Sequence, residues 1–542
     1  MRELEIIREM IMQNSSGIGC SASGSGVLSG KQHEHSGECP AVPGKQFMAP
    51  SKCPIAPGGQ HGVTGGSPVA PGKQAMEPGA WYRPSEECGV FGVYDANGDV
   101  AHTTYYGLYA LQHRGQESCG IAVNKDRNIK YHRSTGLVYE AFDNEALDML
   151  KGNMAVGHVR YSGETNRDPE NSQPLVLRYI KGTLAIVHNG RIMNGEELKE
   201  EFARTGAIFQ TDSDTETIAY AIARERINSM SIEYAVQKVM GILRGAYSVI
   251  LMSPKKLIAF RDRWGFRPLC MGYGKGGSIV FASESCALDA VGAKFERDID
   301  PGEIVVVEQG KVRSLRDNTE KVKSSFCIFE YIYFARIDSV IHGQGVYGAR
   351  KAAGRALALE HPVSADIVIG VPDSGLGAAM GYSEQSGIPY AEGFVKNRYV
   401  GRTFINPENK DRESAVRIKL NPLKSTIDGK KVIMVDDSIV RGTTCARIVK
   451  LLREAGAAEV HVRVSSPPFK WQCFFGTDIP TRKELIACSN STEEMRNLIG
   501  ADSLAFLNVN SLDKIVGDAN CGFCDACFTG AFPIAVDSMS QD

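Results

Sequence analysis

The sequence VIMVDDSIVRGTT, residues 432–444, constrains the fold more than any other part of the chain. Four apolar residues, 432–435, predict a buried strand, and a helical pattern follows the loop after it. A strand-to-helix loop offers backbone N–H groups and hydroxyls to a phosphate. The loop residues with these properties are Ser438, Arg441, Gly442, Thr443 and Thr444. The sequence therefore predicts a phosphate site here, and the alternative is a strand that simply ends in a polar turn.

Two adjacent carboxylates, Asp436 and Asp437, precede this loop. Carboxylates in this position can hold ribose hydroxyls and a Mg²⁺ ion carried on a pyrophosphate. Similar buried strands that run into loops occur in ADIVIGVPDSG at 365–375 and EVHVRVSS at 459–466, with helical patterns between them. This alternation predicts an α/β domain with a mostly parallel sheet.

Residues 88 to about 310 show a different pattern, in which short apolar runs alternate with polar turns. They predict antiparallel sheets, interrupted by helices near 195–205 and 214–227. We therefore expect an α+β domain at 88–315, an α/β domain at 316–480 and a tail at 481–542. The preceding residues 1–87 are expected to be a disordered leader, because Gly, Pro, Ser and Gln dominate about 14–80 and aromatic residues are nearly absent.

The overall composition excludes several classes of protein. A formal net charge of -2 gives no field that would draw the chain to nucleic acid or to an anionic membrane. No run of about 18 apolar residues predicts a transmembrane helix, and charges within the first apolar stretch argue against a secretory signal. We expect a cytoplasmic protein that binds neither nucleic acid nor membrane.

Four separated motifs between Cys88 and residue 216 suggest acyl-transfer chemistry: CGVFGVY, HVRYS, HNGRI and SDTE. Each has a simpler explanation alone. Cys88 could be a small buried residue, the Asn189–Gly190 pair a hairpin turn, and Asp214 a helix cap. Together and in this order, the motifs resemble the class II glutamine amidotransferases, whose N-terminal-nucleophile fold is an αββα sandwich.

This resemblance implies a role for each motif residue. Cys88 would be the nucleophile and the first residue of the mature chain, so residues 1–87 would be a propeptide that is removed autocatalytically. A free α-amino group on Cys88 could then act as the base. Asn189 and Gly190 would form the oxyanion hole, while Arg160 would bind the glutamine α-carboxylate and Asp214 its α-ammonium. Gly163 departs from the RYST sequence of many relatives.

The DDSIVRGTT stretch resembles the motif with which type I phosphoribosyltransferases bind phosphoribosyl pyrophosphate (PRPP). The resemblance implies that Ser374 joins Asp436 and Asp437 at one Mg²⁺ ion, and that Lys396, Arg398 and Arg402 belong to a flexible loop over PRPP. FEYIYFAR at 329–336 resembles the segment that joins the two domains of the amidophosphoribosyltransferases. Such an enzyme makes 5-phosphoribosylamine from glutamine and PRPP, the first committed step of purine biosynthesis.

Two other classes of protein match only half of these features. A different glutamine-dependent transferase would keep the Cys88 motifs but would lack the DDSIVRGTT loop. A PRPP-binding regulator would keep that loop but would have no use for Cys88, Arg160, Asn189 and Asp214 together.

Four cysteines lie in the sequence contexts that hold a [4Fe–4S] cluster in one branch of the family: Cys327, Cys473, Cys524 and Cys527. Zinc is the alternative, because ligand type alone does not distinguish the two. Cys521 forms a second C-x-x-C pair with Cys524, so its role stays open. The family resemblance further implies a homotetramer that is inhibited by purine nucleotides.

Overall fold

The computed structural model describes residues 88–161, 169–316, 322–397, 420–479, 481–517 and 519–536. These residues belong to one compact unit, Met76–Asp542. The predicted leader 1–87 and the predicted residues Gly163, Arg398 and Arg402 lie outside the described residues. No helix in the described ranges is long and apolar enough to cross a membrane.

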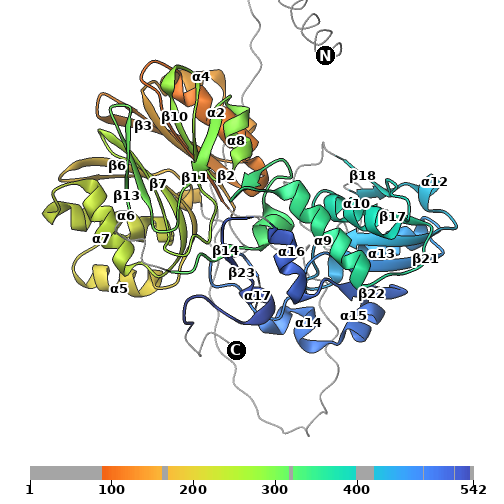
Figure 1. The fold of residues 1–542 in the computed structure, drawn as a ribbon. Coiled ribbons are helices and arrows are strands. Elements are labelled where there is room, and N and C mark those ends of the chain that lie inside the picture. The colour runs from red at the N-terminus through yellow and green to blue at the C-terminus, as the bar shows by residue number, and fades with distance from the viewer. Residues whose placement is uncertain are drawn as a thin grey trace, which may run out of the picture. The chain divides into compact units, whose positions relative to one another are not determined.

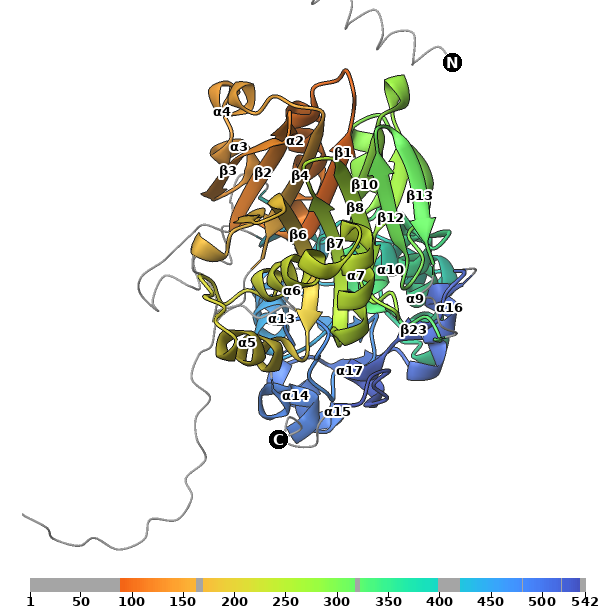
Figure 2. The same cartoon turned by 90° about the vertical axis from the view of Figure 1, so that its left-hand side faces the viewer.

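The first half of the compact unit contains two antiparallel sheets (Figures 1 and 2). The seven-stranded sheet has the order β11 (Lys294–Asp298), β9 (Cys270–Tyr273), β10 (Ile279–Ala282), β1 (Gly89–Tyr94), β4 (Met154–Arg160), β2 (Ser118–Lys125) and β3 (Asn128–Thr135). The six-stranded sheet has the order β13 (Lys311–Leu315), β12 (Ile304–Glu308), β8 (Lys256–Arg261), β7 (Gly245–Met252), β6 (Gly182–Ile192) and β5 (Leu175–Tyr179).

Alternation along β1 shows how this half is layered. Val90 packs between the two sheets, against residues such as Val187 of β6 and Ile250 of β7. Phe91 points to the opposite face, where Leu108 of helix α2 (Val100–Ala110) covers the sheet, because successive strand side chains face opposite ways.

Two further helices, α6 (Asp214–Asn228) and α7 (Ile232–Ile242), cover the outer face of the six-stranded sheet through a separate buried cluster. The layers are helix, sheet, sheet, helix, so the predicted αββα sandwich is confirmed. The helices expected near 195–205 and 214–227 are also present, as α5 (Gly195–Arg204) and α6.

The second half contains a parallel four-stranded sheet, as expected for an α/β domain. Its order is β17 (Ile367–Gly370), β20 (Lys431–Asp436), β21 (Glu459–Val464) and β22 (Ser503–Phe506). Helices α9 (Val346–Glu360) and α10 (Gly375–Ser386) cover one face, and α13 (Thr443–Glu454) and α15 (Thr492–Ile499) cover the other. β22 comes from the segment that the sequence suggested as a tail, and it completes this sheet.

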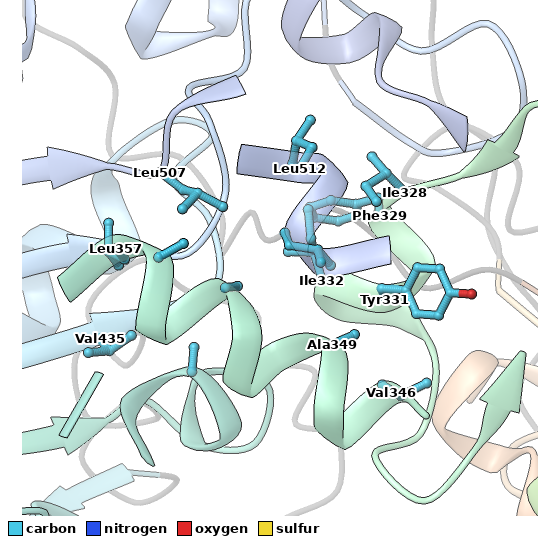
Figure 3. Packing of buried hydrophobic residues seen from close by; sticks show 14 of the residues in the cluster. Ile328, Phe329, Tyr331, Ile332, Val346, Ala349, Leu357, Val435, Leu507 and Leu512 are labelled. Carbon is cyan, nitrogen blue, oxygen red and sulfur yellow. The ribbon is translucent and has the colours of Figure 1, made fainter. Parts of the chain in front are cut away.

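The segment that joins the two halves is buried rather than a free linker. β14 (Phe326–Cys327) pairs in parallel with β23 (Phe523–Cys524), and a π-helical turn, η4 (Glu330–Phe334), follows. Figure 3 shows Ile328, Phe329 and Ile332 packed in the cluster that includes residues of α9. The joining segment is therefore part of the core of the second half.

Candidate active sites

Cys88 lies immediately before β1 and is half-buried. Its Sγ lies 3.6 Å from the backbone oxygen of Tyr161, and its own carbonyl accepts a hydrogen bond of 3.2 Å from Nε of Arg114. Burial raises the pKa of the Cys88 thiol, although the charges of Arg160 and Arg114 oppose this effect. The thiol is therefore protonated at neutral pH, and a nucleophilic role for it requires a base.

Asn189 and Gly190 lie inside β6, opposite Ser248 and Tyr247 of β7, and not at a turn. The hairpin explanation is therefore wrong. The Asn189 side chain is 2% exposed, and its Nδ2 has no hydrogen-bond partner among the described residues. A buried donor without a partner costs about 1–3 kcal/mol, so this amide is suited to a ligand atom.

Gly190 is required by its backbone. Its φ is +133°, and a Cβ atom there would lie 2.1 Å from the carbonyl oxygen of Ala246. Only glycine fits both conditions. Any side chain at position 190 would therefore push β6 away from Ala246 of β7.

Arg160 is the last residue of β4 and is buried. β4 pairs with β1, with Val159 opposite Gly89, so Arg160 lies beside the start of β1. His158 of β4 links the two sheets, because its Nε2 lies 3.1 Å from the backbone oxygen of His188 in β6. His188 directly precedes Asn189. The structure thus brings the ends of β1, β4 and β6 together.

Asp214 is the first residue of α6, but Ser213 provides the helix cap, because its side chain accepts the N–H of Thr215. The carboxylate of Asp214 accepts the N–H of Ile192 at 2.9 Å, just after the Asn189–Gly190 pair. Burial raises the pKa of Asp214 to about 6. The capping explanation is therefore wrong, and Asp214 places a titratable carboxyl group beside β6.

The predicted phosphate loop lies at the carboxyl end of β20. Asp436 is the last residue of this strand, Asp437 follows it, and both are buried. Ser374, before α10, donates a hydrogen bond to Asp437, and Oγ of Ser438 donates another at 2.5 Å. The three residues predicted to hold Mg²⁺ therefore lie at the ends of neighbouring strands, and oxygen ligands of this kind suit that ion.

The loop then enters α13 at Gly442, whose φ is +79°. A Cβ atom there would lie 2.6 Å from Cδ1 of Ile486. Thr443 begins the helix, and Oγ1 of Thr444 is buried without a partner among the described residues. The start of a helix with a buried, unpartnered hydroxyl is suited to an anion.

Two predicted cationic residues make ion pairs. Arg441 pairs with Glu484 at 2.6 Å. Lys396 pairs with Asp373 of the VPDSG loop. Both cations lie within the second half of the chain, and Lys396 is joined directly to the loop that contains Ser374.

The four predicted cluster ligands line one cavity. Its walls include Cys327, Cys473, Cys524 and Cys527, together with apolar side chains and Arg267. Pairing of β14 with β23 sets Cys327 opposite Cys524. Cys521 is not among the lining residues. The structure thus gathers the four cysteines that the sequence singled out, and it leaves out the ambiguous one.

Burial raises the pKa of Cys327 and of Cys524 to about 12, and it also raises that of Cys527. Thiolates in this cavity therefore need nearby positive charge, and Arg267 is the one cation among the described residues that line it. In the described part of the chain, no three His, Cys, Asp or Glu side chains are arranged to hold a single metal ion. Four thiols around one cavity are a donor set that an iron–sulfur cluster takes, and a four-cysteine zinc site uses the same donors.

Sequence reasoning did not identify Arg114, which contacts Cys88, or Glu330, which contacts Arg114. Nη2 of Arg114 donates to Oε1 of Glu330 at 2.8 Å, and both side chains are fully buried. The two residues are 216 positions apart. The sequence signal that could have suggested a buried partner is the single carboxylate, Glu330, within the mostly apolar stretch FEYIYFAR.

Comparisons with known proteins agree with this architecture. A glutamine amidotransferase domain family matches residues 158–290, and a phosphoribosyl transferase domain family matches 346–466. The amidophosphoribosyltransferase of Bacillus subtilis is 47% identical over 83% of this chain and 95% of its own length. That of Methanocaldococcus jannaschii is 46% identical over 83% of this chain and 98% of its own.

Solved structures give the same result. Glutamine PRPP amidotransferase from B. subtilis, complexed with ADP and GMP, superposes with a TM-score of 0.78 at 47% identity and covers 83% of this chain and 98% of its own. A structure described as the allosteric regulatory enzyme of purine biosynthesis gives a TM-score of 0.79 at 46% identity over 84% and 97%. The chain therefore belongs to the amidophosphoribosyltransferase family.

Proposed function

We propose that this protein releases ammonia from glutamine at Cys88 and transfers it to C1 of PRPP. The products are glutamate, pyrophosphate and 5-phosphoribosylamine, and the reaction is the first committed step of purine biosynthesis. The observation that carries the proposal is that one compact unit holds both half-sites, each with a buried polar group that has no partner among the described residues, Asn189 Nδ2 and Thr444 Oγ1.

In the glutamine half, the Cys88 thiolate attacks the side-chain amide, and Asn189 and the Gly190 N–H stabilise the oxyanion. Arg160 binds the α-carboxylate of glutamine, and Asp214 binds its α-ammonium. The raised pKa of the thiol makes a base necessary, and the α-amino group of Cys88 supplies it once residues 1–87 are removed. The mature amidotransferase domain is then 88–315.

In the PRPP half, we propose that residues 316–480 form the transferase domain together with α15 and β22 of the following segment, 481–542. Asp436, Asp437 and Ser374 would hold one Mg²⁺ ion, which would supply positive charge for the pyrophosphate. Ser438, Gly442, Thr443 and Thr444 surround the phosphates with N–H groups and hydroxyls, and Arg441, Lys396 and Arg398 add positive charge. Excluding water from this site favours attack by ammonia over hydrolysis.

The cavity lined by Cys327, Cys473, Cys524 and Cys527 holds a [4Fe–4S] cluster in this proposal. It joins the segment after the first domain to the C-terminal segment, so its role is structural. The B. subtilis relative was solved with ADP and GMP, and this supports purine nucleotides as feedback inhibitors here. We further propose a cytoplasmic homotetramer, in line with the family.

Replacing Cys88 with alanine tests the two-site proposal. The variant should lose glutamine-dependent synthesis of phosphoribosylamine, because the nucleophile is gone. It should keep synthesis from added ammonium, because the PRPP loop is unchanged. Loss of both activities in a folded variant would contradict a separate glutamine site.

The mass of the N-terminus tests the propeptide. Active enzyme purified from its host should begin at Cys88, and an intact residue 1 on fully active enzyme would remove the proposed base. Cys119→Ala, which changes a buried cysteine elsewhere in the same domain, is the matched control for both measurements.

A further inference from the structure

A fully buried group of charges lies behind Cys88. Arg114 donates to Oε1 of Glu330 at 2.8 Å, to its Oε2 at 3.0 Å and to Oε1 of Glu284 at 2.7 Å. Nη1 of Arg267 lies 3.9 Å from Glu330. Burial alone would lower the pKa of the Arg114 guanidinium, but the charges of Glu330 and Glu284 outweigh it and raise that pKa. Glu284 also lies 2.7 Å from Nε2 of His113. Arg114 is thus held by two carboxylates.

Arg114 is also the contact between this group and the proposed nucleophile. Its Nε donates to the carbonyl of Cys88 at 3.2 Å, while its Nη atoms bind Glu330 as a two-pronged pair. A guanidinium held on one edge by a bidentate carboxylate has little freedom on the other. The position of the Cys88 carbonyl therefore depends on where Glu330 lies.

The second half of the chain fixes Glu330. Ile328, Phe329 and Ile332, on either side of it, are buried in the core that α9 helps to form (Figure 3). Arg350 of α9 donates to the backbone oxygen of Tyr331 at 2.9 Å and so holds the same π-helical turn. Isolated π turns occur often at functional sites. A shift of the joining segment would therefore move Glu330, and through it Arg114 of the amidotransferase domain.

We infer that Glu330 is a positioning residue for glutamine hydrolysis, acting through Arg114 on the backbone of Cys88. The inference rests on the proposed role of Cys88 as the nucleophile at the start of the mature chain. A terminal residue has no preceding peptide group to hold it. The carbonyl of Cys88 is then an anchor that sets the direction of both its thiol and its α-amino group.

This arrangement predicts a particular kinetic signature. Glu330 does not belong to the groups assigned to glutamine, Arg160 and Asp214, so its loss should leave the KM for glutamine nearly unchanged. Misplacing a nucleophile by about 1 Å lowers its rate by roughly 100-fold. The effect should therefore appear in kcat of glutamine hydrolysis and not in ammonium-dependent synthesis.

The test compares Glu330→Gln with the wild-type protein in two assays, glutamine hydrolysis and ammonium-dependent synthesis of phosphoribosylamine. Glu303→Gln is the matched control, because Glu303 is a buried carboxylate of the amidotransferase domain that pairs with Arg297 and lies outside this charge group. We expect Glu330→Gln to lower kcat of hydrolysis by about 10-fold to 100-fold, with KM within about threefold. Glu303→Gln should leave kcat of hydrolysis unchanged.

Three outcomes would overturn the inference: unchanged hydrolysis in Glu330→Gln, an equal loss in the ammonium assay, or the same kinetic loss in Glu303→Gln. If Glu330→Gln fails to fold, Glu330→Asp replaces it, since it keeps the charge but shortens the reach to Arg114. Its kcat of hydrolysis should fall less, by about threefold to tenfold, and a wild-type value would overturn the inference. A wild-type protein without glutamine hydrolysis would instead contradict the proposed function.

Discussion

At the scale of single residues, the most informative group is a buried donor that has no hydrogen-bond partner among the described residues. Asn189 Nδ2 is buried and has no partner in the described part of the chain, so the folded protein is less stable than it would be with that donor satisfied. A protein that keeps such a group gains something else from it. Stabilisation of charge that appears only during the reaction is a physical reason of this kind.

Replacing Asn189 with alanine should therefore separate activity from stability. We expect kcat for glutamine to fall by about 100-fold to 1,000-fold. The melting temperature should not fall, because no hydrogen bond within the described structure is lost. Asn124→Ala is the control: Nδ2 of Asn124 donates to Ser253 at 3.0 Å, so this variant should lose stability and keep its activity. The reverse pattern in the two variants would contradict the assignment of the oxyanion hole.

The raised pKa of Asp214 predicts a pH dependence. Above about pH 6 the Asp214 carboxyl group is ionised and can bind the ammonium group of glutamine. Below about pH 6 it is protonated and loses this interaction. In the proposed mechanism the Cys88 α-amine must lose its proton near pH 8, so kcat/KM should already fall about tenfold per pH unit below that value. The slope of log kcat/KM against pH should therefore steepen from about one to about two below pH 6.

The pH profile of Asp214→Asn tests this assignment. Its slope should stay near one throughout, at a lower kcat/KM. Asp212→Asn, which changes an exposed carboxylate two residues away, should keep the steeper limb. A steeper limb that persists in Asp214→Asn would assign this titration to another group.

At the scale of elements, the loop between β20 and α13 has the strand-to-helix geometry that suits an anion. Gly442 has a positive φ and no room for a Cβ atom, and this geometry turns the chain into the first turn of α13. Any side chain at position 442 would both strain the backbone and push against Ile486. The element therefore depends on one glycine for its binding shape.

Gly442→Ala should raise the KM for PRPP by about tenfold or more, in both the glutamine and the ammonium assay, because a displacement of the loop by an ångström is costly. Gly429→Ala is the matched control, since Gly429 also has a positive φ, of 70°, but nothing lies within 4 Å of its added Cβ atom. Both variants should lose some stability from backbone strain. A normal KM in Gly442→Ala, or a raised one in Gly429→Ala, would contradict the role of this loop.

At the scale of the whole molecule, residues far apart in the sequence close the cysteine cavity. Cys327 follows the first domain, Cys473 follows β21, and Cys524 and Cys527 lie near the C-terminus, while Phe266 and Arg267 come from the amidotransferase domain. Whatever fills this cavity therefore joins several segments at once. A cofactor that binds only the folded state stabilises that state by mass action.

If the proposed [4Fe–4S] cluster fills this cavity, Cys473→Ser should remove it from protein purified without oxygen. Iron should fall from about four atoms per chain to near zero, and the brown colour and the melting temperature should fall with it. Cys521→Ser is the control, because Cys521 is half-buried nearby but does not line the cavity, and it should keep its iron. Stoichiometric zinc in colourless wild-type protein would contradict the cluster.

Much of this protein follows from the sequence alone. Local periodicity predicted the two fold classes, since the burial of alternating or continuous apolar residues depends on neighbours in the chain. The roles of Cys88, Asn189, Gly190 and the DDSIVRGTT loop came from the resemblance of short motifs to known families, and these roles stay predictions. The four cysteines were found through their contexts.

Only the tertiary structure decided which residues meet. It showed that Asn189 lies inside a strand, that Ser213 and not Asp214 caps α6, and that Cys521 stands apart from the cavity. It also showed that Arg114 and Glu330 form one buried pair across 216 positions. Contacts of this kind depend on how the sheets and the joining segment pack, and no local pattern records which distant charge will balance another.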